Sequence, residues 1–283
     1  MSGCAWGPWP RVGLTTRFRD HVGRTPLTFW ETKDVLGVRR PLAPGAVACV
    51  SLFADNRLGR DHPDWRQVAQ DQSPAARGAA PYFDWDCLCP SREGVRRAAM
   101  AWVDEAVGAG VANGPGPASL RLSDVGFARE GYCRCVACAE GAASLGLDIE
   151  AYRERRILSV LTDIRARVTG RLFVTLYPDP YPGHLERRFG VSPDALATLA
   201  DAYVVPLYDL AYATTHWLET LCQGFADRLR GRAWYAELYA LGVPEERLRR
   251  AARVALAYAN GVVLAYERDA ARLERLLAAL AGA

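Results

Sequence analysis

The stretch ASLRLSDVGFAREGYCRCVAC, residues 118–138, decides how the rest of this sequence is interpreted. It begins with an alternating apolar run around Leu120 and Leu122, which predicts a short buried strand. Asp124 follows where the run stops, and three cysteines come nine to fourteen residues later. Strand ends are rigid and the loops beyond them are exposed, so this arrangement is typical of a functional site.

Outward from this stretch, strand-like runs alternate with helical patterns. Strands are expected at residues 46–53, 118–122, 172–177, 202–208, 233–238 and 261–266, and helices at residues 91–107, 148–168, 193–201, 215–229, 244–258 and 269–280. Such alternation means parallel strands joined by right-handed crossovers. We therefore predict an α/β fold, a single TIM-type (β/α)8 barrel over residues 1–283. A doubly wound sheet is the alternative, but the glycine-rich phosphate turn of that fold is missing after the first strand.

The N-terminal region is harder to interpret than the rest. A strand is expected at residues 11–16 and a helix at residues 27–38, before Pro41 and Pro44 break the pattern. This leaves room for an irregular or incomplete N-terminal portion of the barrel.

Composition narrows the function classes. The hydrophobic share of 50% and the charged share of 24% are ordinary for a globular protein, and a net charge of +3 is too small to indicate a nucleic-acid partner. The first residues resemble no signal peptide, and no apolar run reaches the roughly 20 residues of a membrane helix. We expect a cytoplasmic protein with no membrane partner. Lys33 is the only lysine; all other basic residues are arginines.

Several motifs follow one another along the chain. They are the loop His62-Pro63-Asp64-Trp65, the step Cys89-Pro90, the strand that ends at Asp124, the segment Cys133-x-Cys135-x-x-Cys138 and the strand at residues 204–208. In this order they resemble the glycoside-hydrolase-like (β/α)8 barrels, largely hypothetical proteins of bacteria and archaea, over roughly residues 46–267. Members of that group more often carry a second acid or an aromatic residue where this chain has Ser123. The resemblance implies a carbohydrate ligand bound at the C-terminal ends of the strands.

Acids recur at the predicted strand ends. Glycoside cleavage needs two carboxyl groups, and the analogy with retaining barrel glycosidases makes Asp124 on strand four the proton donor and Glu237 on strand seven the nucleophile. Each acid could instead cap a helix or pair with an arginine, although Glu237, inside an apolar strand, must be paired or functional if it points inward. Substrate contacts are predicted for Asp55, Trp65, Asp179, Tyr208, Asp209, Tyr239 and Glu267, and sugar-stacking faces also for Tyr177, Trp217 and Tyr235.

The cysteines predict a metal site. Cys133, Cys135 and Cys138 place three soft ligands within six residues, a spacing that lets one loop wrap a tetrahedral ion. The preceding loop offers Cys87 or Cys89 as the fourth ligand, and the proline after Cys89 favours it. A structural zinc is expected rather than a catalytic one, because four thiolates leave no open position. Unligated thiols or a disulfide are the alternatives, and Cys4, Cys49 and Cys222 are expected to stand apart.

Three functions remain open on these grounds. The first is a glycoside hydrolase or related carbohydrate-active enzyme. The second is a non-catalytic barrel that binds a saccharide or a protein and uses zinc to hold its loops. A minor alternative is the class of barrel enzymes that exchange guanine in transfer RNA; they share the thiol spacing but add a downstream histidine, here His184 or His216. The low positive charge disfavours that alternative.

Overall fold

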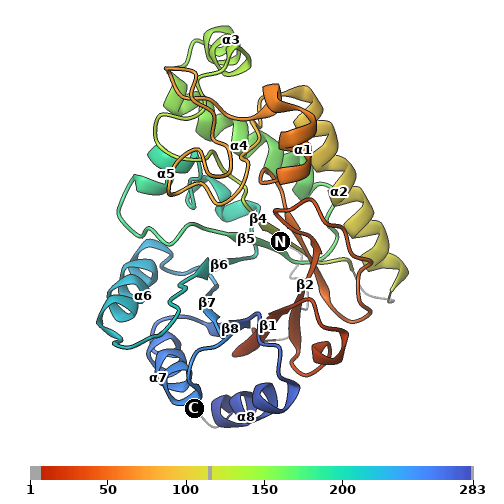
Figure 1. Ribbon diagram of the computed structural model, residues 1–283, viewed down its shortest axis with the longest axis vertical. Coiled ribbons are helices and arrows are strands. Elements are labelled where there is room, and N and C mark those ends of the chain that lie inside the picture. The colour runs from red at the N-terminus through yellow and green to blue at the C-terminus, as the bar shows by residue number, and fades with distance from the viewer. Residues whose placement is uncertain (1–7, 114–116, 282–283) are drawn as a thin grey trace.

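The computed structural model describes residues 8–113 and 117–281 of the chain. Within them, parallel strands β1 to β8 pair in sequence order and close into a barrel (Figure 1). The strands are β1 (Val12–Thr16), β2 (Leu27–Lys33), β3 (Val47–Ser51), β4 (Leu120–Ser123), β5 (Leu172–Thr175), β6 (Ala202–Pro206), β7 (Trp234–Tyr239) and β8 (Gly261–Ala265). The predicted TIM-type barrel is confirmed.

Helices surround the strands, with α6, α7 and α8 on one side of the barrel and α2 and α4 on the other (Figure 1). The α-helices are α1 (Asn56–Asp61), α2 (Glu93–Ala112), α3 (Val136–Leu145), α4 (Ile149–Arg165), α5 (His184–Phe189), α6 (His216–Arg228), α7 (Glu245–Leu256) and α8 (Ala270–Ala281). Short 3-10 helices lie at Arg19–His21, Pro63–Trp65 and Ala195–Thr198. The residues that α2 buries are those of the apolar face the sequence predicts.

The expected helix at residues 27–38 is wrong, because β2 occupies Leu27–Lys33. The sequence LTFWETK alternates between the two faces of a strand, and β2 pairs with β1 on one side and β3 on the other. These ladder hydrogen bonds, together with burial of all seven residues, outweigh a weak helical pattern. Among the residues described, the connections β1–β2 and β2–β3 contain no α-helix. The N-terminal portion of the barrel is irregular in this respect.

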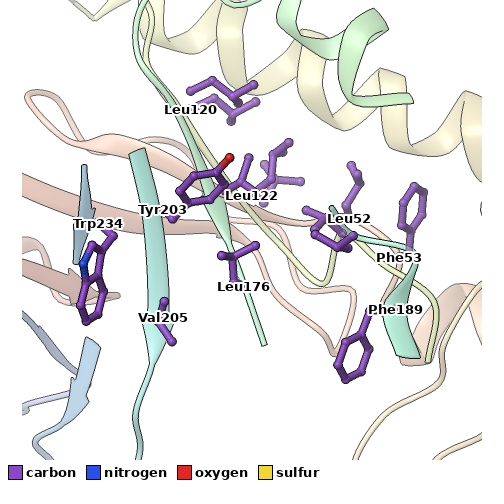
Figure 2. Close-up of a cluster of buried hydrophobic side chains, with 14 of the residues drawn as sticks. Leu52, Phe53, Leu120, Leu122, Leu176, Phe189, Tyr203, Val205 and Trp234 are labelled. Carbon is purple, nitrogen blue, oxygen red and sulfur yellow. The ribbon is translucent and has the colours of Figure 1, made fainter. Parts of the chain in front are cut away.

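Alternation along the strands separates two layers of the core. Outward side chains pack under the helices, and Figure 2 shows part of this layer, with Leu120 and Leu122 on the side of β4 that faces the helices. Inward side chains such as Phe29, Phe173 and Tyr235 form an apolar plug inside the barrel. Because side chains alternate along a strand, the next inward residues lie two positions further toward the C-terminal ends of the strands. These residues carry the polar groups of the site.

Two long loops lie side by side at the C-terminal end of the barrel, drawn in orange and green in Figure 1. The first, residues 52–92, follows β3 and folds on itself through short antiparallel bridges such as Ala54 with Cys87 and Arg66 with Leu88. The second, residues 124–135, follows β4 and leads into α3. The Arg134 N–H donates to the Val68 carbonyl at 2.7 Å and joins them. Residues 118–138, from which the sequence analysis started, thus form part of one wall at the C-terminal end of the barrel.

Candidate functional site

A cavity of about 720 Å³ opens at the C-terminal ends of the strands. Side chains from all eight strands or from the residues directly after them line it, among them Asp124 and Glu237. The two acids singled out from the sequence therefore face one space. This is the position at which barrel enzymes of this architecture carry their active sites.

Glu237 lies in β7 with its side chain 1% exposed and is held by four hydrogen bonds. Arg121 donates to its two oxygens at 2.5 and 2.8 Å, Thr15 donates at 2.5 Å and the Tyr208 hydroxyl at 2.7 Å. A carboxylate offers about four acceptor sites, so these donors satisfy it fully. Burial acts to raise the pKa of Glu237, but the Arg121 charge and the hydrogen bonds outweigh it and the pKa is lowered.

Arg121 spans the barrel from β4 to β7. Its neighbours Leu120 and Leu122 point outward, so alternation turns Arg121 inward, where its guanidinium lies 4.9 Å from the centre of the Phe29 ring. Its remaining donors reach Thr175 on β5 at 3.0 Å and Thr15 on β1 at 2.8 Å. An arginine between two leucines of a predicted strand is the sequence signal for this inward residue, which was not among the predicted site residues.

Asp124 has a different environment directly after β4. Its φ of 52° is left-handed, a conformation that costs an L-residue about 1–2 kcal/mol and that aspartate tolerates better than most. Ser123 donates to its carboxylate at 3.0 Å. Burial raises the pKa of Asp124, against the opposing effects of the Ser51 and Ser123 hydroxyls and the charges of Lys33 and Arg121.

The two acids on this cavity have opposite pKa shifts. A raised pKa favours the protonated form that a proton donor needs, whereas a lowered pKa keeps the second group ionised. Chemically, the arrangement of Asp124 and Glu237 can protonate a leaving group and stabilise positive charge on the bound molecule.

A third carboxylate, Glu31 on β2, also lines the cavity. It accepts from the Tyr266 hydroxyl at 3.0 Å and pairs with Arg17 at 2.9 Å. Burial raises its pKa. The rings of Tyr208, Tyr239 and Tyr266 lie 5.7 to 6.2 Å apart between Glu31 and Glu237. Sequence reasoning missed Glu31 because it placed residues 27–38 in a helix.

Lys33, the single lysine, ends β2 and lines the cavity beside the end of β3. Its ammonium pairs with Asp55 at 3.1 Å and donates to the Ser51 and Ala54 carbonyls at 2.7 and 2.8 Å. Burial lowers its pKa. Asp55 in turn caps α1 by accepting from the Leu58 N–H at 2.7 Å. The predicted substrate contact at Asp55 is thus occupied by an ion pair and a helix cap.

The other predicted contacts divide into two groups. Tyr208, Asp209, Tyr177 and Trp217 line the cavity. Outside its lining lie Asp55, Trp65, Asp179, Tyr235, Tyr239 and Glu267. Their neighbours explain this: Trp65 stacks on His62 with ring centres 3.9 Å apart, Asp179 pairs with Arg188 and His184, and Glu267 pairs with Arg272.

The predicted thiols form one buried group beside the cavity wall. The sulfurs of Cys89, Cys133, Cys135 and Cys138 all lie within 4.8 Å of one another. Cys89 approaches Cys138 at 3.4 Å and Cys135 at 3.6 Å, so Cys89 rather than Cys87 joins the group. These four residues are close enough to hold a metal ion.

The surroundings of the thiols suit a charged sulfur cluster. The Val68 N–H points at the Cys133 sulfur at 3.4 Å, and the Ser91 hydroxyl lies 3.2 Å from the Cys138 sulfur and 3.0 Å from the Tyr152 hydroxyl. Such outer hydrogen-bond partners orient metal ligands. Cys49, in the apolar plug, and Cys222 are separate, as expected, whereas Cys4 lies outside the described residues.

Comparisons with solved structures give the fold a context. The glycoside hydrolase domain of PgaB (BpsB) from Bordetella bronchiseptica superposes with a TM-score of 0.66 at 14% identity, over 97% of this chain and 98% of that one. Alpha-L-fucosidase isoenzyme 2 from Paenibacillus thiaminolyticus gives 0.65 at 15% identity, over 98% of this chain and 49% of that one. TtGalA, an alpha-galactosidase from Thermus thermophilus, gives 0.54 at 17% identity, over 98% of this chain and 62% of that one.

At these identities the likeness is one of fold, and the barrel is glycoside-hydrolase-like. The chain spans about half the length of the fucosidase. No family model and no curated protein matches the sequence. In the part of the chain that the structure describes, no helix combines the length and the hydropathy needed to span a bilayer.

Proposed function

We propose that this protein cleaves glycosidic bonds, with Asp124 as the proton donor and Glu237 as the anionic partner. The observation that carries the proposal is the pair of carboxyl groups on one cavity, held by environments that favour opposite protonation states. The barrel neighbours named above, which include a fucosidase and a galactosidase, support a carbohydrate substrate.

In this mechanism the Asp124 carboxyl protonates the glycosidic oxygen as its bond to the anomeric carbon breaks. The Glu237 carboxylate stabilises the positive charge on the sugar and, in a retaining reaction, bonds to the anomeric carbon as the leaving group departs. A water molecule that gives its proton to the Asp124 carboxylate then displaces Glu237 from the sugar and restores both groups. Tyr208 is 43% exposed at the cavity and donates to Glu237 Oε2, so a shift of its hydroxyl would open one acceptor site on that oxygen to the substrate. Arg121 would still donate to both oxygens and fix the carboxylate plane.

The test is the dependence of the Asp124→Asn variant on the leaving group. A proton donor matters for poor leaving groups and little for good ones. We expect kcat to fall by about 10²–10⁴-fold on oligosaccharides and alkyl glycosides, and much less on dinitrophenyl glycosides. Asp227→Asn, on the exposed face of α6, serves as the control. An equal loss on all substrates, or none, would remove Asp124 from this role.

A second function, a non-catalytic saccharide-binding barrel, is favoured by one observation. Glu237 has four donors and a side chain 1% exposed, which is also how a purely structural ion pair looks. Calorimetry and product analysis on one oligosaccharide panel separate the two functions. The binding barrel would be favoured if wild type bound the oligosaccharide without cleaving it. In that case Glu237→Gln should lower the stability of the fold and have no catalytic effect.

We further propose that the four thiols hold a structural zinc, which would cross-link the two loops without an open coordination position. The set of four cysteine sulfurs supports zinc, and the use of Cys89 as the fourth member departs from the histidine of the guanine-exchanging barrels. A cytoplasmic location, where thiols stay reduced, would suit this site. Elemental analysis should find one zinc per chain, lost in Cys138→Ser and kept in Cys222→Ser. Iron with thiolate absorption bands would contradict zinc.

A further inference from the structure

A short path of hydrogen bonds connects the thiol group to Asp124. The Phe53 N–H donates to the Asp124 carbonyl at 3.1 Å, and the Phe53 carbonyl accepts from the Leu88 N–H at 2.7 Å. Leu88 is the residue before Cys89. The backbone of Asp124 is therefore tied, through one residue of the β3 loop, to the chain that carries a thiol of the group.

Gln67 makes a second connection between the same two loops. Its side chain is fully buried, its amide donates to the Leu88 carbonyl at 3.0 Å, and its oxygen accepts from the Ala128 N–H at 2.8 Å. Its backbone N–H also donates to the Cys87 carbonyl at 2.8 Å. A buried amide paired at both ends is a specific connector, since losing either partner leaves a polar group unsatisfied.

Contacts with Cys89, Cys133 and Arg134 hold the segment around Gln67 from both sides. The Cys89 N–H donates to the Trp65 carbonyl at 2.8 Å. On the other side the Val68 N–H meets the Cys133 sulfur at 3.4 Å, and the Arg134 N–H donates to the Val68 carbonyl at 2.7 Å. We call residues 65–68 the strap. It lies between the two pieces of chain that an ion would join.

Asp124 needs such support because its left-handed backbone is not one it adopts freely. The far side of its loop is fixed to α5, where the Phe127 N–H donates to the Phe189 carbonyl at 2.8 Å. We propose that a metal ion on the four thiols positions Asp124, acting through the strap and Phe53, with Gln67 as a positioning residue. The positioning itself needs no catalysis; its consequence for the reaction rests on the proposed function.

The first test is amide hydrogen exchange on protein loaded with zinc and on the same protein after removal of the ion with a chelator under reducing conditions. The amides of Phe53, Leu88 and Ala128 should exchange at least tenfold faster after metal loss. The Leu207 and Val262 amides, which donate to the Glu237 and Arg11 carbonyls in the barrel, should keep their rates.

Three results would overturn the proposal. The first is unchanged exchange at the three amides after verified metal loss. The second is equal acceleration of all five amides, which would make the ion a general support of the fold. The third is a protein that takes up no metal when zinc is added.

Gln67→Ala tests the strap with all four thiols intact. We expect full zinc content and at least tenfold faster exchange at Ala128, whereas Gln70→Ala, an exposed glutamine of the same loop, should match wild type. Unchanged Ala128 exchange in Gln67→Ala would remove Gln67 from the positioning role.

The pH profile of activity separates this inference from the proposed function. In Gln67→Ala, kcat should fall more than KM changes, and the limb of the profile assigned to Asp124 should move toward the ordinary pKa of an aspartate as burial is lost. Faster exchange without any hydrolase activity in wild type would uphold the positioning and defeat the proposed function. A profile unchanged in Gln67→Ala would overturn the positioning.

Discussion

The two walls of the cavity hold their carboxyl groups by different means. Asp124 lies on a wall of irregular loops, residues 52–92 and 124–135, with a strained backbone and a raised pKa. Glu237 lies on the wall of strands β6 to β8, paired with Arg121 and packed beside tyrosine rings, with a lowered pKa. The barrel alone fixes the second group. The first depends on contacts between the two loops that also carry Cys89, Cys133 and Cys135.

The largest effect is expected where the rigid wall loses its ion pair. Arg121→Met leaves Glu237 buried without its cation, and removing one partner of a buried pair costs about 3–5 kcal/mol. Urea denaturation at neutral pH measures the free energy of unfolding. The double variant Arg121→Met/Glu237→Gln should recover part of the loss. If the double variant were no more stable than Arg121→Met, the loss would not come from an uncompensated charge.

The two acids should have opposite effects on stability at neutral pH. The folded-state pKa of Glu237 is lowered from 4.5, so ionised Glu237 stabilises above that pH and the contribution is lost as pH falls through the folded value. The folded-state pKa of Asp124 is raised from 3.8, so its ionised form costs stability at neutral pH, and this cost disappears on acidification.

Glu237→Gln should therefore destabilise the protein at pH 7 by about 1.5–3 kcal/mol, the worth of charged hydrogen bonds. Asp124→Asn should stabilise it by about 0.5–1 kcal/mol, since asparagine accepts the same backbone conformation. Denaturation curves from pH 3 to 8 should show both differences shrinking toward acid. Asp124→Asn less stable than wild type at pH 7 would mean that Asp124 is held as a structural anion.

The smallest loss of stability is expected at the tyrosine cluster. Tyr266→Phe removes the hydroxyl that donates to Glu31 at 3.0 Å and keeps the ring. A hydrogen bond of this kind contributes about 0.5–1.5 kcal/mol, and Arg17 still faces Glu31. Thermal unfolding should detect a loss in that range. A loss several times larger would show that Glu31 depends on Tyr266 more than on Arg17.

The sequence predicted the barrel because strand-like and helical runs alternate after residue 46, and because buried parallel strands are apolar on both faces. It failed at β2, where Phe29 and Trp30 alone do not distinguish a strand from a helix and pairing on both sides decides. Because of that error, Glu31 and Lys33 were not predicted to be inward polar residues of the site. The thiol group was predicted because ligand spacing within one loop is a local property.

The sequence by itself determined the order of strands, the position of Asp124 and Glu237 at or near strand ends, and three of the four thiols in one segment. These depend on local periodicity and spacing. Only the tertiary structure decided what each acid contacts. Arg121 donates to Glu237 across the barrel, and Lys33 forms an ion pair with Asp55. The strap connects Cys89 to the loop that follows Asp124. Partners brought together by barrel closure are far apart in the chain, and the environment that sets a carboxyl group's pKa is made of those partners.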